Sequence, residues 1–263
     1  MRKKAVAKTK TSPKQMALQK LVPNMMTLAA LTAGMTSIQY AIDERWERAV
    51  IAIVIAAFID AFDGAAARVL NATSRLGAEL DTLSDFLCFG IAPATIMYLW
   101  LLQDAGKVGW IVAVVFAIAA ALRLARYNVE DKDENKNLVP EAKSSRFFTG
   151  VPSPTAGGMA LLPLILSFQF SDIAMVNRFV TTPDFVAIWM SLFAILMVSR
   201  LPTFSSKQVQ LPSQMVVPML AVFGLMIAGL IHATWITLTL MGVVYGLSIP
   251  LAVLLAYRQA KAT

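Results

Sequence analysis

The sequence predicts an all-α integral membrane protein, a polytopic bundle of about eight transmembrane helices with its functional site near the cytoplasmic face. Three observations predict this class. Hydrophobic residues make up 57% of the 263-residue chain and charged residues only 15%, and the mean hydropathy of +0.65 lies outside the range of soluble globular domains. Apolar runs recur at membrane-crossing length, and basic residues gather in alternate connections between them.

The apolar runs are each about 17 to 25 residues long, the length of helix that crosses a bilayer. Helices are expected because an isolated strand cannot satisfy its backbone polar groups in lipid. The expected spans are 21–41, 49–70, 80–103, 108–126, 150–170, 184–200, 213–231 and 234–256. We expect one transmembrane domain over 21–257, between a basic arm at 1–20 and a short tail at 258–263.

The distribution of lysine and arginine predicts the orientation of the chain. Of the 23 basic residues, seven lie in 1–20, two in 68–75, six in 123–146, two in 200–207 and two at the C-terminus, whereas the alternate connections hold only four. Because cytoplasmic connections carry the excess of basic residues, both termini are expected in the cytoplasm.

The net charge of +7 does not indicate a nucleic-acid partner, because the basic residues are dispersed over short connections rather than gathered on a soluble domain. Anionic lipid headgroups are the expected partner. The arm at 1–20 contains no acidic residue, so it either lies on the cytoplasmic leaflet or is a solvated tail.

Two connections have a local pattern of their own. Residues 130–146 mix both signs of charge, which predicts a cytoplasmic loop. The string FFTGVPSPTAGG that follows predicts an ordered turn entering the fifth helix, and its small residues predict close helix packing. Glycines in the last two spans also predict close packing and a possible dimer face: Gly224, Gly229, Gly242 and Gly246.

Functional side chains are expected between Asp60 and Asp85, where DAFDGAAARVLNATSRLGAELDTLSD places four aspartates in two membrane spans. An ionisable side chain at the bilayer centre costs about 2.5 to 3.5 kcal/mol even on a permissive scale, so it is retained where it faces a cavity, a partner or an ion. Asp60 and Asp63 are three apart, and Asp81 and Asp85 are four apart. Each pair therefore projects from one face of its helix, and the two faces can converge.

The chemistry of this segment favours a divalent metal and a phosphate. Carboxylates without His or Cys suit hard cations such as Mg²⁺ or Mn²⁺, with substrate phosphate completing the coordination. Arg68 and Arg75 leave an excess of negative charge that a structural salt-bridge network does not explain. Gly64 and Gly77 leave room for a ligand or another backbone, and Arg68 offers a bidentate fork for phosphate.

The spacing D-x-x-D-G-x-x-A-R, eight residues, then G-x-x-x-D-x-x-x-D resembles the signature of the CDP-alcohol phosphotransferases. These membrane enzymes move a phosphatidyl-type group from a CDP-linked donor to an alcohol. The signature positions are Asp60, Asp63, Gly64, Ala67, Arg68, Gly77, Asp81 and Asp85, all of which are filled.

The resemblance implies a two-metal site occupied by Mg²⁺ or Mn²⁺. Asp60, Asp63 and Asp81 would hold the first ion, Asp81 and Asp85 the second, and Asp85 would also accept the proton of the alcohol. The implied residues that bind the donor, CDP-diacylglycerol, are Asn24, Thr27, Gly64, Arg68, Ser74 and Gly77. For Asn24 and Thr27, hydrogen bonds to neighbouring backbone are the alternative.

Three strings, NATSRLGAELDTLSDFLCFGIAP, ALRLARYN and FFTGVPSP, are similar to the CDP-diacylglycerol–serine O-phosphatidyltransferase branch of the family. This similarity implies L-serine as acceptor, phosphatidylserine and CMP as products, a homodimer and a bacterial-type cytoplasmic membrane. Arg123 and Arg126, three apart at a cytoplasmic helix end, are hypothesised to bind the serine carboxylate; snorkelling to lipid headgroups is the alternative.

Three other functions remain open at this point. A related transferase would share residues 60–85 but use glycerol 3-phosphate, inositol or choline. A prenyltransferase also holds a diphosphate with aspartates and Mg²⁺, but it would leave the glycine and arginine spacing unexplained. A cation-coupled transporter would use the aspartates as an ion relay, yet the sequence has no second acidic half and no inverted repeat.

Overall fold

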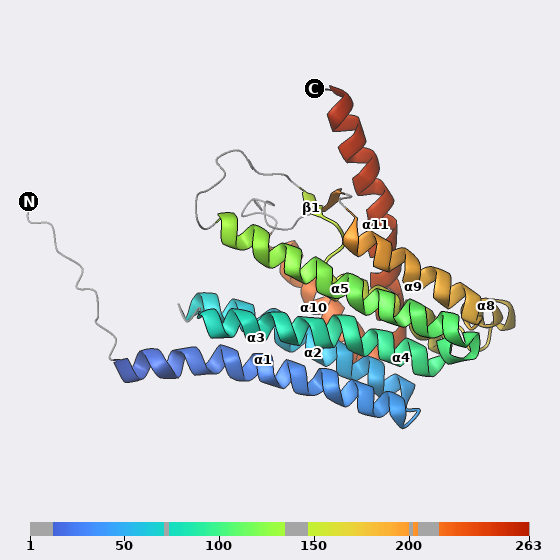
Figure 1. Cartoon of the computed structure of the whole chain (residues 1–263), viewed down its shortest axis with the longest axis horizontal. Coiled ribbons are helices and arrows are strands. Elements are labelled where there is room, and N and C mark those ends of the chain that lie inside the picture. Colours follow the sequence, from blue (N-terminus) through green and yellow to red (C-terminus); the bar gives the residue numbers. More distant parts are fainter. Residues whose placement is uncertain (1–12, 71–73, 135–146, 200–201, 205–215, 263) are drawn as a thin grey trace, which may run out of the picture.

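The structure, a computed structural model, describes residues 13–70, 74–134, 147–199, 202–204 and 216–262. This part of the chain is helical apart from two three-residue strands (Figure 1). The elements are α1 (Pro13–Ile42), α2 (Trp46–Val69), α3 (Arg75–Phe86), the π-helix η1 (Leu87–Ile91), α4 (Ala92–Trp100), the 3₁₀-helix η2 (Leu102–Ala105), α5 (Lys107–Glu134), β1 (Phe147–Thr149), α6 (Ser153–Ala160), α7 (Leu162–Gln169), α8 (Ala174–Val180), α9 (Pro183–Val198), β2 (Pro202–Phe204), α10 (Val216–His232) and α11 (Thr234–Ala262).

Five helices among the described residues are long and apolar enough to cross a membrane: Leu21–Ile42, Trp46–Val69, Arg75–Trp100, Lys107–Val129 and Thr234–Ala252. They coincide with the first four expected spans and the last one. A sixth span is obtained if α8 and α9, which are bent by 59° at the break between them, cross together. The chain is a multi-pass helical membrane protein as expected, but the predicted count of eight spans is not confirmed.

Two of the expected spans correspond to shorter helices among the described residues. The span expected at 150–170 is divided at Leu161 into α6 and α7, of eight residues each. Pro163 stands in the first turn of α7, and because proline lacks the backbone N–H and clashes with the preceding turn, a helix cannot run through it undisturbed. The span expected at 213–231 corresponds to α10, whose 17 residues are at the lower limit of the length that crosses a bilayer, and residues 205–215 before it lie outside the described part.

Three helices extend into segments that we expected to be connections. Helix α1 begins at Pro13, inside the arm expected at 1–20, and α11 continues to Ala262, through the expected tail. Helix α5 continues to Glu134, so the first residues of the loop expected at 130–146 are helical, and residues 135–146 lie outside the described part. No proline or glycine interrupts these stretches, so the helices can continue past the apolar spans.

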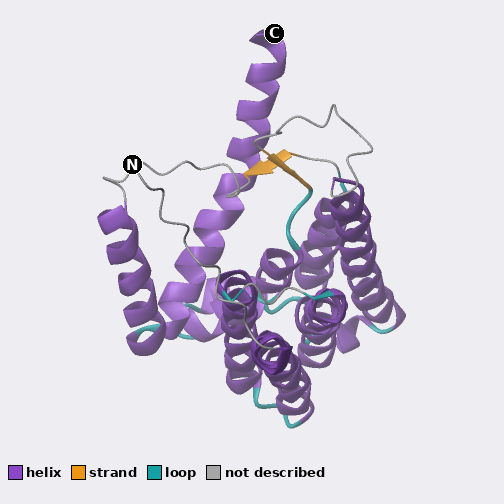
Figure 2. Ribbon diagram, turned by 90° about the vertical axis from the view of Figure 1, so that its left-hand side faces the viewer, coloured by secondary structure: helices purple, strands orange, loops and turns teal. Residues whose placement is uncertain are grey.

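The apolar core lies where α4, α5, α7 and α9 meet. Its largest fully buried side chains include Met97, Phe116, Leu164 and Met190, each with no accessible surface. Large apolar side chains also cover the outside of the bundle, where lipid rather than water is the expected neighbour. In Figure 2 several helices are seen nearly end-on, whereas α11, which ends at the C-terminus, runs steeply across their direction.

Close approach of helices depends on glycine, as expected for FFTGVPSPTAGG. A Cβ atom at Gly157 would lie 2.8 Å from the backbone oxygen of Phe89, so α6 packs directly on the backbone of η1. Of the C-terminal glycines, Gly242 lies against Leu162 and Gly229 against Thr237, where a Cβ would meet side-chain atoms at 2.6 Å. These two glycines therefore serve packing within the chain; the predicted dimer stays a prediction.

The turn expected before the fifth helix is present at Gly150. This residue has a φ of +84°, and an added Cβ would lie 2.8 Å from the backbone oxygens of Met197 and Ser199. Just before it, β1 pairs antiparallel with β2 in the register Phe147 to Phe204. The turn thereby joins the start of α6 to the end of α9 (Figures 1 and 2).

Candidate active site

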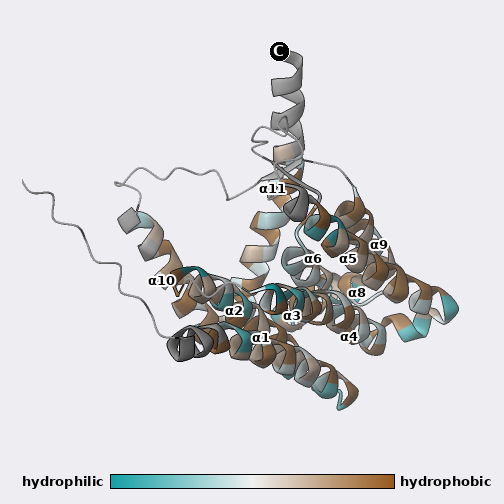
Figure 3. Cartoon of the chain, turned by 60° about the vertical axis from the view of Figure 1, so that its left-hand side comes forward, coloured by the Kyte–Doolittle hydropathy of each residue, from teal (hydrophilic) through white to brown (hydrophobic). Residues whose placement is uncertain are grey.

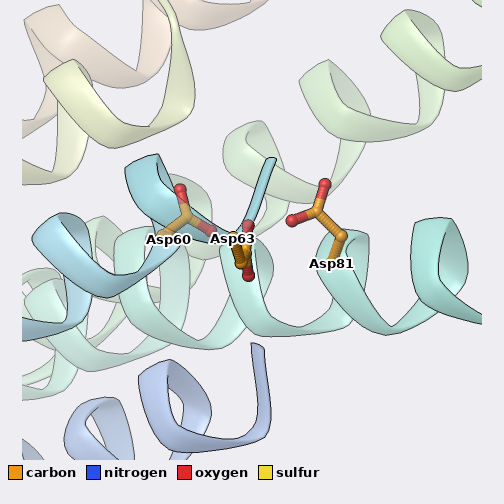
Figure 4. Close-up of side chains that lie close together, drawn as sticks. All are labelled: Asp60, Asp63 and Asp81. Atoms are coloured by element: carbon orange, nitrogen blue, oxygen red, sulfur yellow. The ribbon is translucent and has the colours of Figure 1, made fainter. Parts of the chain in front are cut away.

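The hydrophilic positions of α2 and α3 come together inside an otherwise apolar bundle (Figure 3). Asp60 and Asp63 lie on α2 and Asp81 lies on α3, and their nearest carboxylate oxygens are all within 4.8 Å of one another. Figure 4 shows the carboxylate of Asp81 directed toward those of α2. The predicted convergence of the two helix faces is thus what the structure contains.

Helix α3 is started by Ser74, whose side chain accepts a hydrogen bond from the backbone N–H of Gly77 at 3.0 Å. This N-cap satisfies one of the backbone donors that a helix end leaves unpaired. The cap fixes the residue at which α3 begins. It thereby helps to fix the position of Asp81 and Asp85 along α3 relative to α2.

The carboxylates of the cluster have the properties of cation ligands. Atom Oδ1 of Asp60 and atom Oδ1 of Asp85 are buried and have no hydrogen-bond partner. The Asp85 side chain reaches that of Asp60, but it does not belong to the three-residue cluster of Asp60, Asp63 and Asp81. Buried carboxylate oxygens without a donor are costly unless a cation compensates them, so these residues fit a hard divalent metal.

Thr27 on α1 holds one of these aspartates in place. Its Oγ1 donates to Oδ2 of Asp63 at 2.7 Å and lies 3.1 Å from the backbone oxygen of Pro23. Asp63 is only 3% exposed, whereas Asp81 is exposed. The cluster therefore runs from a buried, hydrogen-bonded carboxylate to an accessible one, which a ligand can approach.

A pocket of about 200 Å³ adjoins the aspartates between α1, α2 and α3. It is lined by Pro23, Asn24, Thr27, Asp63, Gly64, Ala67, Arg68, Ser74, Gly77, Ala78 and Asp81. All six residues predicted to bind the donor are among them. Their contacts with a donor stay a prediction, but the structure brings them together beside the carboxylates.

The two signature glycines occupy different surroundings. A Cβ atom at Gly64 would meet nothing within 4 Å, so this position opens into free space beside the pocket. A Cβ at Gly77 would lie 2.8 Å from Oδ1 of Asn24 and 3.0 Å from Oγ of Ser74. Gly64 thus leaves room for a ligand, and Gly77 lets α1 and α3 approach each other.

The three arginines predicted to bind ligands have different hydrogen-bond partners. Arg68 is exposed at the pocket, and its Nε donates to the backbone oxygen of Gly64 at 3.1 Å. Arg126 donates to the backbone oxygen of Val198 at 3.1 Å. Arg123 donates to Oγ of Ser153 at 3.3 Å and interacts electrostatically with Asp85. Of the two arginines hypothesised to bind serine, Arg123 alone has a described interaction with an aspartate of the signature.

Polar residues that sequence reasoning did not single out surround Arg123. Ser153 and Thr155 lie on α6, and the hydroxyl of Thr155 is 3.3 Å from that of Tyr245 on α11. Both α6 residues occur in the string FFTGVPSP and its continuation, which we interpreted as a turn, as close helix packing and as a mark of the serine branch, without assigning a site residue to it. Tyr245 stands 90 residues away in an apolar span, and no spacing in the sequence connects it to α6.

Comparison with known families agrees with these observations. The model described as CDP-alcohol phosphatidyltransferase matches residues 20–183, which include the aspartates, the pocket and α6. A second model, described as CDP-alcohol phosphatidyltransferase 2, matches residues 214–250. The two matches together cover most of the helical bundle.

Relatives from several bacteria are similar to this chain, and each is named CDP-diacylglycerol–serine O-phosphatidyltransferase. The protein of Mycobacterium tuberculosis (strain ATCC 25618 / H37Rv) is 33% identical over 234 residues, 89% of this chain and 78% of the relative. That of Bacillus subtilis (strain 168) is 35% identical over 152 residues, 58% of this chain and 78% of the relative. That of Helicobacter pylori (strain ATCC 700392 / 26695) is 33% identical over 150 residues, 57% of this chain and 60% of the relative.

Proposed function

This chain belongs to the CDP-alcohol phosphatidyltransferase family, and we propose that it transfers the phosphatidyl group of CDP-diacylglycerol to the hydroxyl of L-serine. The products are phosphatidylserine and CMP. The observation that carries the proposal is the convergence of Asp60, Asp63 and Asp81 within 4.8 Å beside a pocket lined by the signature residues. The names of the relatives support serine as the acceptor.

The pocket between α1, α2 and α3 binds the CDP group of the donor. Gly64 leaves open space there, and the exposed guanidinium of Arg68 faces the phosphates, for which its planar fork is suited. Asn24 and Ser74 line the same pocket and offer hydrogen-bonding groups to the nucleotide. The acyl chains stay in the lipid that surrounds the bundle.

Asp60, Asp63 and Asp81 would hold a divalent cation, Mg²⁺ or Mn²⁺, and Asp81 with Asp85 would hold a second. The bound metal would supply positive charge beside the phosphates of the donor. Thr27 keeps the buried Asp63 in its orientation through their hydrogen bond, as partners of metal-binding carboxylates commonly do.

Asp85 acts as the general base. It accepts the proton of the serine hydroxyl while the serine oxygen attacks the phosphorus that carries diacylglycerol, and the bond from this phosphorus to the CMP oxygen breaks. Arg123, which interacts electrostatically with Asp85, binds the serine carboxylate and so places the hydroxyl near the base. Arg126 is occupied by the backbone oxygen of Val198 and positions the end of α9 instead.

The active site faces the cytoplasm, with both termini on the same side. The aspartates lie toward the end of the bundle where α2 ends and α3 begins, and the connection there carries Arg68 and Arg75, in agreement with the positive-inside rule. A water-soluble nucleotide group reaches the pocket from this side.

CMP release by the detergent-purified protein tests the proposal. The protein is given CDP-diacylglycerol with Mg²⁺ or Mn²⁺ and, in separate reactions, serine, glycerol 3-phosphate, inositol or choline, before and after chelation with EDTA. We expect CMP release in the reaction with serine and in none of the reactions with the other three alcohols. We also expect EDTA to abolish this release. Release with a different alcohol would keep the family and overturn serine as acceptor, and release that survives EDTA would overturn the metal. No release with any alcohol would favour the transporter.

A further inference from the structure

We propose that the hydroxyl groups of Tyr245 and Thr155 bind the ammonium group of the acceptor, so that the C-terminal helix α11 supplies part of the acceptor site. This inference rests on the proposed function, because it takes the acceptor to be an amino acid with a hydroxyl. It adds to that function a reason why a zwitterion is selected and a role for a helix outside the signature.

The first observation is how the hydroxyl groups of Thr155 and Tyr245 are hydrogen-bonded. Thr155 Oγ1 donates to the backbone oxygen of Pro152 at 2.8 Å and lies 3.3 Å from the Tyr245 hydroxyl. Thr155 Oγ1 is the donor in both contacts, and because a hydroxyl has a single proton, the shorter contact to Pro152 leaves little of it for the Tyr245 oxygen. The Tyr245 oxygen therefore keeps a lone pair for an ammonium N–H, which is what an ammonium group requires.

The second observation is how α11 reaches α6. Gly242 stands one helical turn before Tyr245 and Gly246 on α11, three and four residues away from them. A Cβ at Gly242 would lie 2.6 Å from Cδ1 of Leu162, and one at Gly246 would lie 3.4 Å from Cε of Met159. The absence of side chains at these positions lets α11 approach α6 and α7 closely, which carries the Tyr245 hydroxyl to Thr155.

The third observation is the charge around this pair. Arg123 interacts electrostatically with both Asp85 and Tyr245 and donates to Oγ of Ser153. Arg123, Thr155 and Tyr245 are each only partly buried. Arg123 therefore links Asp85 on α3 to the hydroxyl pair on α6 and α11.

The three polar groups of serine match these three features of the protein. Its hydroxyl faces Asp85, its carboxylate faces Arg123, and its ammonium faces the oxygens of Tyr245 and Thr155. Acceptors without an ammonium group, such as inositol and glycerol 3-phosphate, leave the hydroxyl pair without its ligand. Tyr245 and Thr155 are therefore positioning residues, and their removal should weaken serine binding rather than the chemical step.

The test is the full-length protein with Tyr245→Phe, which removes one oxygen and keeps the ring. We expect the KM for serine to rise about tenfold, as for loss of a hydrogen bond to a charged group, while the KM for CDP-diacylglycerol stays within about twofold. The matched control is Tyr98→Phe, because the Tyr98 ring packs edge-on against Trp110 and Tyr98 lines no part of the proposed site, so this variant should change neither constant. A serine KM within twofold of wild type in Tyr245→Phe, or an equal rise in both KM values, would overturn the inference.

Variants at Thr155 provide a second measurement that does not depend on α11. Thr155→Val should raise the serine KM, and Thr155→Ser, which keeps the hydroxyl, should restore it to within about twofold of wild type. If both variants are equally impaired, the side chain acts through packing and the inference is wrong.

The wild-type protein separates failure of the inference from failure of the proposed function. A wild type that uses serine, together with a Tyr245→Phe variant of unchanged serine KM, would overturn the inference alone. A wild type that releases CMP with a different alcohol would overturn both.

Discussion

Asp63 and Asp81 belong to the same carboxylate cluster but differ in solvent exposure. Asp63 is buried and accepts a hydrogen bond from Thr27, whereas Asp81 is exposed at the pocket. A buried carboxylate with a fixed partner offers a preset ligand, and an exposed one can adjust when substrate arrives. At the scale of single residues, therefore, metal affinity should depend on Thr27 although this residue need not touch the metal.

Replacing Thr27 by valine tests this dependence. Thr27→Val removes the hydroxyl at nearly constant shape, so Asp63 loses its donor, and we expect the metal concentration for half-maximal CMP release to rise about 10- to 100-fold. Thr36→Val on the same helix is the control, because the Thr36 hydroxyl bonds only the backbone of its own helix in the described contacts. A change in the KM for CDP-diacylglycerol without a change in metal activation would instead assign Thr27 to the donor.

Replacing Asp85 by asparagine tests the general base. Asp85→Asn keeps the size of the side chain but cannot accept the proton of serine, so we expect kcat to fall by about 10² to 10⁴. The KM values for both substrates should change much less. Asp104→Asn in η2, outside the signature, is the matched control and should retain wild-type kcat. A residual rate within about tenfold of wild type would remove Asp85 from the role of base.

At the scale of elements, the π-helix η1 begins two residues after Asp85 in the chain. A wider turn within an otherwise α-helical span often occurs next to a functional site. Here it carries Gly90, where a Cβ would lie 2.9 Å from that of Ala120, and Phe89, which lies against Gly157. The span that provides Asp81 and Asp85 is thus packed directly on α5 and α6, the helices that carry Arg123 and Thr155.

The C-terminal part of α2 allows a separate test of the donor pocket. Gly64→Ala adds a methyl group where nothing lies within 4 Å, and alanine favours a helix by about 1 kcal/mol over glycine, so thermal stability should be kept or increased. Because that methyl group projects beside the pocket, we expect the KM for CDP-diacylglycerol to rise.

Gly158→Ala is a close control for this variant, since Gly158 is also helical and also has nothing within 4 Å of an added Cβ. It should gain stability in the same way without a change in the KM for CDP-diacylglycerol. Equal KM values in the two variants would show that the space above Gly64 is not used by the donor.

At the scale of the whole molecule, the membrane orientation determines which compartment supplies the nucleotide. Cys88, the only cysteine, is 1% exposed, so new cysteines can be labelled against little background. In intact cells, a membrane-impermeant maleimide should label Asp104→Cys but not Lys3→Cys, and both should react after permeabilisation. The reverse pattern would place the active site on the outer side of the membrane.

The sequence predicted which residues lie together beside the aspartates better than it predicted the shape of the bundle. Asp60, Asp63, Asp81 and Asp85 could be brought together because helical spacing defines faces within each span. The break at Leu161, the bend between α8 and α9 and the contact of Tyr245 with Thr155 could not be predicted. They depend on which helices pack together, and hydropathy, which is similar on many helix faces, does not specify this.

The residues of the candidate active site come from two separate parts of the chain. The aspartates and the donor pocket come from α1, α2 and α3, before residue 90, whereas Arg123, Thr155 and Tyr245 come from α5, α6 and α11. Under the proposed roles, mutations in the later helices should change which alcohol is accepted and leave the binding of the nucleotide unchanged. Such a division would let evolution vary the headgroup of the product lipid while the aspartates stay as they are.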